Sequence, residues 1–221
     1  MIMKHLKIMS IAFMAVATSS MAQSLNKMNW LNEPQQWEIK DGKTLVMDVP
    51  AKTDFWRISH YGFTVDDGPF YYATYGGEFE AKVKITGNYV TTFDQMGLML
   101  RIDHENWIKA GVEYVDGKQN VSAVVTHRTS DWSVVQLPDA PRSIWIKAVR
   151  RLDAVEIFFS RDDKEYIMMR TCWLQDNCPV MVGLMGACPD GKGFTATFEE
   201  FKVTPLADQR RLEWAKRQIN K

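Results

Sequence analysis

The sequence is poor in the residues that metal centres and nucleophilic active sites usually need. It has four histidines and three cysteines among 221 residues. The cysteines lack zinc-type spacing and have no histidine nearby. The G-x-S-x-G motif of serine hydrolases is absent, and the scattered histidines provide no Ser–His–Asp set. We therefore predict no metal site and no cofactor, and the sequence gives no support for a serine hydrolase.

The cysteine count is odd, so at least one thiol stays unpaired. Cys172 and Cys178 stand on either side of the pentapeptide WLQDN, and Cys188 follows further along the chain. Whether Cys172 and Cys178 form a disulfide stays open from the sequence. We predict buried and unreactive thiols, because free cysteine behaves as a small apolar residue.

Neither sign of charge is in excess. The 27 Lys and Arg side chains equal the 27 Asp and Glu side chains in number. A near-neutral chain lacks the basic surface that attracts nucleic acid or acidic membranes. Nucleic acid is therefore not a predicted partner.

An apolar run stands near the N-terminus, where IMSIAFMAVA follows Lys4 and Lys7. Ser20 and Ala22 then supply the small residues of a cleavage site, which predicts a signal peptide over residues 1–22. The run is too short to span a bilayer comfortably, which argues against membrane insertion. We therefore expect an exported protein, periplasmic or extracellular. Its mature chain is predicted to form one domain over residues 23–205 and a helical tail over residues 206–221.

Alternation with a period of two dominates the middle of the chain and predicts short β-strands. In EFEAKVKI, Phe79 and every second residue after it are apolar, while charged residues occupy the opposite face. Dipeptides such as Asp-Gly between two such runs are typical of hairpin turns. Hairpins are predicted at VDGK (115–118), KDGK (40–43) and SRDDKE (160–165).

The strand pattern has two further features that bear on the fold. In FTATFEEFKV the inward parity changes between Phe198 and Phe201, which predicts a β-bulge near Glu199. Only the tail LADQRRLEWAKRQIN has helical periodicity, with Leu212, Ala215 and Ile219 on one stripe. About a dozen short strands without an intervening long helix predict two packed antiparallel sheets in an all-β fold.

The stretch NWIKAGVEY combines an unusual set of residues on one face of a predicted strand. Trp107, Lys109, Gly111 and Glu113 share one parity. A glycine inside a strand often marks the close approach of a ligand or of another backbone. This face is therefore a candidate binding surface, and the alternative is an ordinary solvated face of a sheet.

Other segments carry similar residues and extend this candidate surface. Tryptophan rings stack on the apolar face of a pyranose, while carboxylates, amides and ammonium groups bind its hydroxyls. We predict Trp107 and Trp132 as stacking platforms with Trp56 at the rim; for these three, core packing is the alternative. The predicted ligand-binding residues are Trp56, His60, Gln95, Trp107, Lys109, Glu113, Thr126, Asp131 and Trp132.

Two alternatives to simple sugar binding stay open. A glycan hydrolase would need two carboxyl groups across the scissile bond. The candidate catalytic residues are Glu113, Asp131 and Asp54, in the pairs Glu113 with Asp131 or Glu113 with Asp54. An exported module that binds another protein is the other alternative. The acidic turns DDG (66–68) and DD (162–163) leave a structural calcium ion open, although solvated turns are the favoured interpretation.

Several consecutive motifs resemble the regulation-of-enolase-type family of unknown function in the concanavalin A-like lectin/glucanase superfamily. They are WLNEP, TDFW, HYGF, DQMGLMLRID, NWIKAGVEY, VSAVVTHRTSDWS and VGLMGACPDGKGF. The resemblance spans about Trp30 to Val203 and implies a concanavalin A-like jelly-roll sandwich with a concave face. A glycan or glycoconjugate is the partner that it implies. The run of acidic residues typical of laminarinase-type glucanases is absent, so their mechanism does not carry over.

Overall fold

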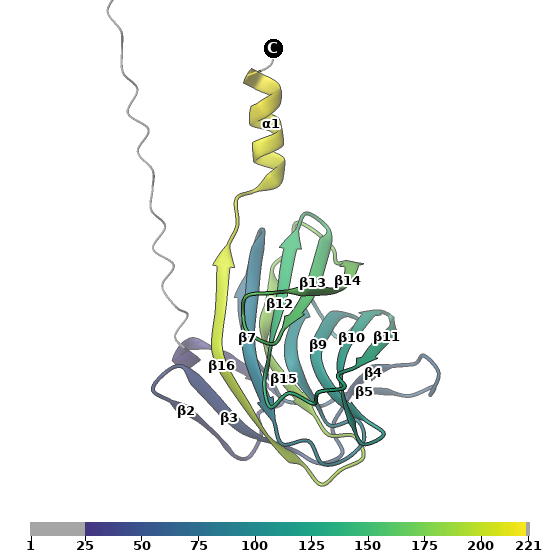
Figure 1. Ribbon diagram of the computed structural model, residues 1–221. Helices are drawn as coiled ribbons and strands as arrows, with labels where there is room; N and C mark the ends of the chain where they lie inside the picture. The colour runs from purple at the N-terminus through teal and green to yellow at the C-terminus, as the bar shows by residue number, and fades with distance from the viewer. Residues whose placement is uncertain (1–24, 220–221) are drawn as a thin grey trace, which may run out of the picture.

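The protein is a sandwich of two β-sheets in a computed structural model that describes residues 25–219 (Figure 1). Each sheet has seven strands, and all strand pairs are antiparallel. The predicted signal peptide, residues 1–22, lies outside the described residues. Neither helix within residues 25–219 has the length and apolarity that crossing a membrane requires.

The two sheets are named here the front sheet and the back sheet. The front sheet contains, in spatial order, β1 (Asn29–Leu31), β6 (Phe70–Tyr75), β15 (Val180–Ala187), β8 (Gln95–Arg101), β9 (Asn106–Val115), β10 (Lys118–His127) and β11 (Thr129–Gln136). The back sheet contains β14 (Ile167–Trp173), β13 (Ala154–Ser160), β12 (Ile144–Arg151), β7 (Phe79–Gly87), β16 (Phe194–Pro205), β3 (Thr44–Val49) and β2 (Trp37–Lys40). The remaining elements are β4 (Phe55–Arg57), β5 (Thr64–Asp66), η1 (Leu25–Lys27) and α1 (Gln209–Ile219).

Alternation along the strands builds the core between the sheets. In β7, Phe79, Ala81, Val83 and Ile85 are at most 1% exposed, while the charged residues between them face solvent in part. The front sheet contributes residues such as Ile108, which is equally buried, to the same core. The predicted two-sheet antiparallel sandwich with a short C-terminal helix is confirmed.

The turn chemistry also follows the sequence. Asp116 and Gly117 have φ values of 50° and 77° between β9 and β10, the left-handed pair that a tight hairpin needs. The hairpins predicted at 40–43 and 160–165 form the β2–β3 and β13–β14 connections. In β16 the register shifts between Glu199 and Lys202, with φ of 56° at Glu200. The predicted bulge is therefore confirmed.

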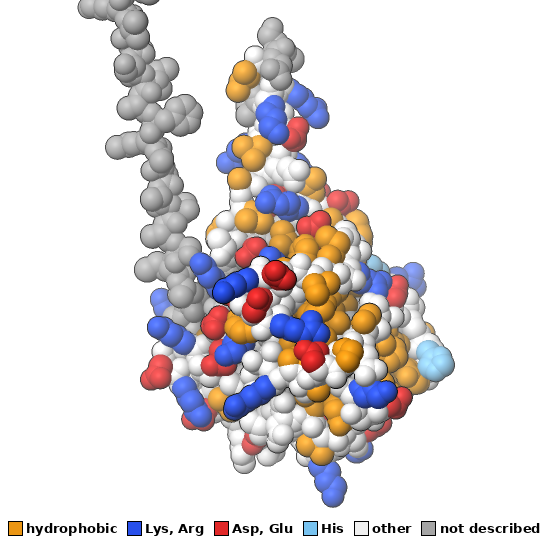
Figure 2. Space-filling model, viewed as in Figure 1, with side chains coloured by type: hydrophobic (Ala, Val, Ile, Leu, Met, Phe, Trp, Pro, Cys, Tyr) orange, Lys and Arg blue, Asp and Glu red, His pale blue; other side chains and the backbone are white. Residues whose placement is uncertain are grey.

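Helix α1 extends away from the end of the sandwich (Figure 1). Leu212 and Ile219, two members of its predicted apolar stripe, are 49% and 83% exposed. Elsewhere on the surface, basic and acidic side chains are interspersed over the face that Figure 2 shows. This mixture matches the equal numbers of basic and acidic residues in the sequence.

All three cysteines are free thiols, so Cys172 and Cys178 do not form the bridge that the sequence left open. Cys188 is fully buried, and the other two are partly buried. Burial raises the pKa of both Cys172 and Cys188 to about 11. The prediction of buried thiols is confirmed for Cys188 only. Because thiolate is the reactive form, a raised pKa lowers the reactivity of Cys172 and Cys188 at neutral pH.

The β4–β5 hairpin covers part of the outer face of the front sheet. Beneath it lies a second apolar cluster, separate from the core between the sheets: Phe55, Trp56, Phe70, Met99, Trp107, Val124, Met185 and Ala187. Phe55 and Trp56 come from the hairpin, and the other residues come from front-sheet strands. The hairpin therefore packs on this apolar cluster and forms one side of the site described next.

Candidate functional site

The floor of the candidate site is the outer face of β8, β9 and β10. Gly111 pairs with Gly97 of β8 and with Ser122 of β10, so a row of small residues crosses the three strands. A Cβ on Gly111 would lie 1.9 Å from the carbonyl oxygen of Met96 and 2.7 Å from the Cα of Gly97. Of the two explanations for this glycine, the structure supports the close approach of another backbone.

We expect Gly111→Ala to lower the free energy of unfolding by about 3 kcal/mol, because overpacking against rigid backbone stands at the costly end of such changes. Urea denaturation followed by tryptophan fluorescence measures the loss. Gly76→Ala is the matched control, since a Cβ there meets no atom within 4 Å. Equal stability of the two variants would contradict the argument.

Lys109 lies on one side of this row with its charge buried. Its Nζ donates to the carbonyl oxygen of Phe55 at 2.7 Å, to Gln95 Oε1 at 2.6 Å and to Asp54 Oδ1 at 3.4 Å. Gln95 completes the group by donating from Nε2 to Asp54 Oδ1 at 3.4 Å and to the carbonyl oxygen of Phe93 at 3.2 Å. These contacts tie the start of the hairpin to the floor.

Glu113 lies on the other side of the row and is 6% exposed. Its Oε2 accepts hydrogen bonds from Ser122 Oγ at 2.6 Å and from Trp132 Nε1 at 2.9 Å. Burial raises the pKa of Glu113 above its ordinary value, and the Lys109 ammonium and the two hydrogen bonds offset this only in part. A carboxyl group with a raised pKa, facing a cavity, marks a candidate functional site.

Aromatic rings enclose a cavity of about 290 Å³ above this floor. We call it the aromatic pocket. Its aromatic residues are Trp56, Tyr61, Phe63, Phe93 and Trp132, and its polar residues are Asp54, Gln95, Lys109, Glu113 and Asp190, with Val124 and Pro189 completing the lining. An apolar cavity with a few converging polar groups is the usual form of a small-ligand site.

The tip of the β4–β5 hairpin supplies the outer wall of the aromatic pocket. Tyr61 and Phe63 stack with ring centroids 5.5 Å apart and are about half exposed. The tip holds three residues with left-handed backbone, Ile58, His60 and Gly62. Such a conformation is unusual for a β-branched residue like Ile58 and is often found at ligand-binding segments.

The structure brings six of the predicted site residues together in the aromatic pocket: Asp54, Trp56, Gln95, Lys109, Glu113 and Trp132. His60 is exposed at the hairpin tip, edge-on to Tyr61 at 4.6 Å, and does not line the cavity. The ligand-binding roles of the six pocket residues remain predictions, but the structure shows that these residues lie close together.

Three predicted site residues lie elsewhere, and their assignments are corrected. Trp107 is 1% exposed beneath Phe55, so it offers no face for a sugar. Thr126 is fully buried against Ser130 Oγ at 2.9 Å. Asp131 pairs in register with Val125 and forms an ion pair with Arg170 at 3.0 Å.

The position of Asp131 also removes one of the two proposed catalytic pairs. Its strand neighbour Trp132 lines the aromatic pocket, so Asp131 points to the opposite face of the sheet. Glu113 and Asp131 therefore do not face a common cavity. Asp54 is the remaining predicted partner of Glu113, and both line the aromatic pocket.

Several pocket residues were not predicted from the sequence. Tyr61 and Phe63 belong to the motif HYGF, whose Gly62 signals a turn. Phe93 and Asp190 stand in connecting segments far apart in the chain, where strand parity gives no information. Ser122 shares the parity of the floor and holds Glu113 in place.

The acidic turns noted in the sequence are occupied by protein contacts. Asp66 binds Arg101 through both carboxylate oxygens, at 2.5 and 2.6 Å. Asp162 accepts backbone hydrogen bonds from Lys164 and Glu165 within its own turn. Among residues 25–219, no group of three or more His, Cys, Asp or Glu side chains is placed to hold a metal ion.

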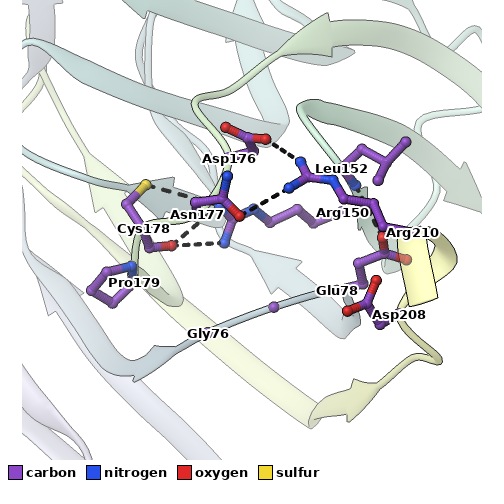
Figure 3. A pocket seen from close by; sticks show the side chains of 11 residues that line it. Gly76, Glu78, Arg150, Leu152, Asp176, Asn177, Cys178, Pro179, Asp208 and Arg210 are labelled. Atoms are coloured by element: carbon purple, nitrogen blue, oxygen red, sulfur yellow. Dashed lines mark hydrogen bonds and ion pairs between the residues drawn. The ribbon is translucent and has the colours of Figure 1, made fainter. Parts of the chain in front are cut away.

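A second cavity, of about 440 Å³, lies where α1 leaves the sandwich (Figure 3). Among its charged lining residues, Arg210 contacts Asp176, and it also contacts Asn177. The buried Arg150 donates to the carbonyl oxygens of Cys178 and Gln175. These contacts fasten the segment before β15 and the start of α1 to the sandwich, which is a structural role.

Comparison with known proteins places the chain among proteins of similar fold. A family model described as "Protein of unknown function (DUF1349)" matches residues 30–206. The chain is 35% identical to "Regulation of enolase protein 1" of Saccharomyces cerevisiae over 180 residues, covering 81% of this chain and 90% of that protein.

Two solved structures extend the comparison. The crystal structure of a functionally unknown protein from Saccharomyces cerevisiae has a TM-score of 0.80 at 34% identity, covering 84% of this chain and 100% of that one. A carbohydrate-binding module from Bacillus subtilis has a TM-score of 0.52 at 14% identity, covering 81% of this chain and 98% of that one. At such low identity, the second likeness concerns the fold alone.

Proposed function

The chain belongs to the DUF1349 family of proteins of unknown function, and from the geometry of the aromatic pocket we propose that it binds carbohydrate. The observation that carries the proposal is the arrangement of five aromatic side chains around the buried carboxylate of Glu113. Ring faces suit the apolar face of a sugar, and carboxylate oxygens accept hydrogen bonds from its hydroxyls. The fold shared with a carbohydrate-binding module is consistent with this proposal.

One wall of the aromatic pocket is a tryptophan ring that the protein holds in place. Trp132 is held by hydrogen bonds from its Nε1 to Glu113 Oε2 and to Ser122 Oγ at 3.1 Å. Phe93 stands edge-on to this ring, with centroids 6.4 Å apart. A ring fixed in this way loses little conformational freedom when a ligand stacks on it, which favours binding.

We expect Trp132→Ala to weaken glycan binding at least about tenfold, because a buried aromatic anchor typically contributes more than about 1.4 kcal/mol. The measurement is a screen of the purified protein on immobilised glycans, followed by calorimetry on the best ligand. Trp173→Ala is the control, since Trp173 is 51% exposed on edge strand β14 and does not line the pocket. A variant at Trp132 that binds like wild type would place the ligand elsewhere.

A glycan hydrolase is the second candidate, and the raised pKa of Glu113 is the observation that favours it. A general acid must stay protonated near the working pH. Asp54 is the available second carboxyl group. The same screen, read for released reducing sugar, separates the two functions: release that is lost in Glu113→Gln would make the protein an enzyme. Retention without release supports a binding protein. If the protein is neither retained nor releases sugar, the search turns to protein partners.

We also propose that the protein acts after export. This rests on the signal-peptide pattern of residues 1–22. Sequencing the N-terminus of the protein recovered outside the cytosol tests it, and the expected first residue is Gln23.

A further inference from the structure

The polar groups of the aromatic pocket fall into two classes, donors and acceptors, and their hydrogen bonds can be counted. The ammonium of Lys109 has three N–H groups and three acceptors, which are Phe55, Gln95 and Asp54. Gln95 uses its amide nitrogen on Asp54 and on the carbonyl oxygen of Phe93. Both side chains are therefore fully engaged within the protein.

The remaining donors of the pocket floor and its inner wall are engaged as well. Trp132 Nε1 bonds to Glu113 and Ser122, and the hydroxyl of Ser122 donates to Glu113. Trp56 Nε1 donates to the carbonyl oxygen of Ser59 at 2.8 Å. The Tyr61 hydroxyl, at the exposed rim, is a polar group of the pocket lining that remains available as a donor.

The carboxylate acceptors, in contrast, are only partly engaged. Glu113 Oε2 and Asp54 Oδ1 accept hydrogen bonds from the protein, whereas no residue among 25–219 donates to Glu113 Oε1 or Asp54 Oδ2. Asp190 adds an exposed carboxylate to the lining. Three carboxyl groups thus face the cavity against the single ammonium of Lys109, whose hydrogens are already bonded.

From this count we infer that the aromatic pocket selects a positively charged, amine-bearing sugar ring and rejects acidic sugars. An ammonium group supplies the hydrogens that Glu113 Oε1 and Asp54 Oδ2 lack, and such charge-assisted bonds are the strong ones. The aromatic walls add cation–π attraction. A carboxylate, sulfate or phosphate would meet like charge and find its only cation already engaged. This inference rests on the proposed carbohydrate-binding function.

The test compares three oligosaccharides of equal length that differ in charge. They are built from glucosamine, N-acetylglucosamine and glucuronate, and methylammonium, which keeps three N–H donors, is added as a cation without a sugar. Calorimetry with the full mature chain measures each affinity at near-neutral pH and low salt. We expect the glucosamine oligomer to bind at least about tenfold more tightly than the acetylated one, and the glucuronate oligomer to show no binding.

Each other outcome decides between this inference and the proposed function. Equal binding of the glucosamine and acetylated oligomers, or tightest binding of glucuronate, overturns the inference and leaves carbohydrate binding in place. Binding of methylammonium without any sugar overturns carbohydrate binding and keeps the preference for a cation. No binding of any of the four overturns both.

Two variants locate the preference. Glu113→Gln keeps the side-chain shape and is expected to lower affinity for the glucosamine oligomer at least about tenfold, and for the acetylated oligomer less than about threefold. Asp190→Asn removes an exposed carboxylate at no cost to the floor, so it reports even where Glu113→Gln fails to fold. A smaller loss for glucosamine alone is expected there. Losses that are equal for both oligomers in both variants would overturn the inference.

Discussion

Replacing Trp107 with alanine is expected to lower the free energy of unfolding by about 3–5 kcal/mol, the range for removing a large aromatic side chain from a core. Trp107 is 1% exposed in the cluster beneath the β4–β5 hairpin, with its ring 6.2 Å from that of Phe55. Two effects are expected: the cavity left by the ring destabilises the front sheet, and the β4–β5 hairpin loses part of the apolar cluster on which it packs. Urea denaturation at equilibrium measures the first effect.

Hydrogen exchange separates the second effect from the first. Amide exchange within β4 and β5 should speed up more than exchange in the back sheet, because the hairpin, unlike the back sheet, packs on this cluster. Trp173→Ala, at an exposed edge, is expected to cost less than about 1 kcal/mol. If Trp107→Ala were as stable as this control but failed to bind glycan, the interpretation of Trp107 as a stacking platform would return.

The contrast between Trp107 and Lys109 shows what strand alternation can and cannot predict. Both residues share one parity, and both do point away from the core between the sheets. Parity determines which face of a sheet a side chain occupies, but not what covers that face. The hairpin that covers Trp107 comes from residues 55–66, which lie 41 to 52 positions earlier in the chain. Its docking depends on tertiary packing, for which a single sequence carries no local signal.

Asp131 illustrates a different error. Asp131 and Trp132 were predicted to share the site, although neighbours on a strand point to opposite faces. The alternation rule alone would have separated them, since Trp132 pairs with Val124 and Asp131 with Val125. The alternating strands, the hairpins at 40–43, 115–118 and 160–165, the bulge near Glu199 and the family resemblance were predictable from the sequence, because each depends on local pattern or on matching motifs. The β4–β5 hairpin was not predicted.

Lys109→Met is expected to cost about 3–5 kcal/mol near neutral pH, because it leaves buried carboxylates without their cation. Lys109 and Asp54 side chains are 6% and 15% exposed, and Glu113 is 6% exposed. Methionine keeps most of the length of lysine, so packing changes little. Lys84→Met is the matched control: its ion pair with Glu199 on the back sheet is partly solvated, and such pairs contribute about 1 kcal/mol or less.

The cost of Lys109→Met should also depend on pH. Burial already raises the pKa of Glu113, and loss of the Lys109 charge raises it further. A carboxyl group whose pKa is higher in the folded than in the unfolded state makes the folded state bind more protons, so stability falls as pH rises through that folded pKa. The deficit against wild type should therefore be larger at about pH 7 than at about pH 5. Denaturation midpoints at both pH values test this. A deficit independent of pH would mean that Lys109 supports the pocket by packing and not by its charge, which would weaken the case for a ligand cation beside Glu113 and Asp54.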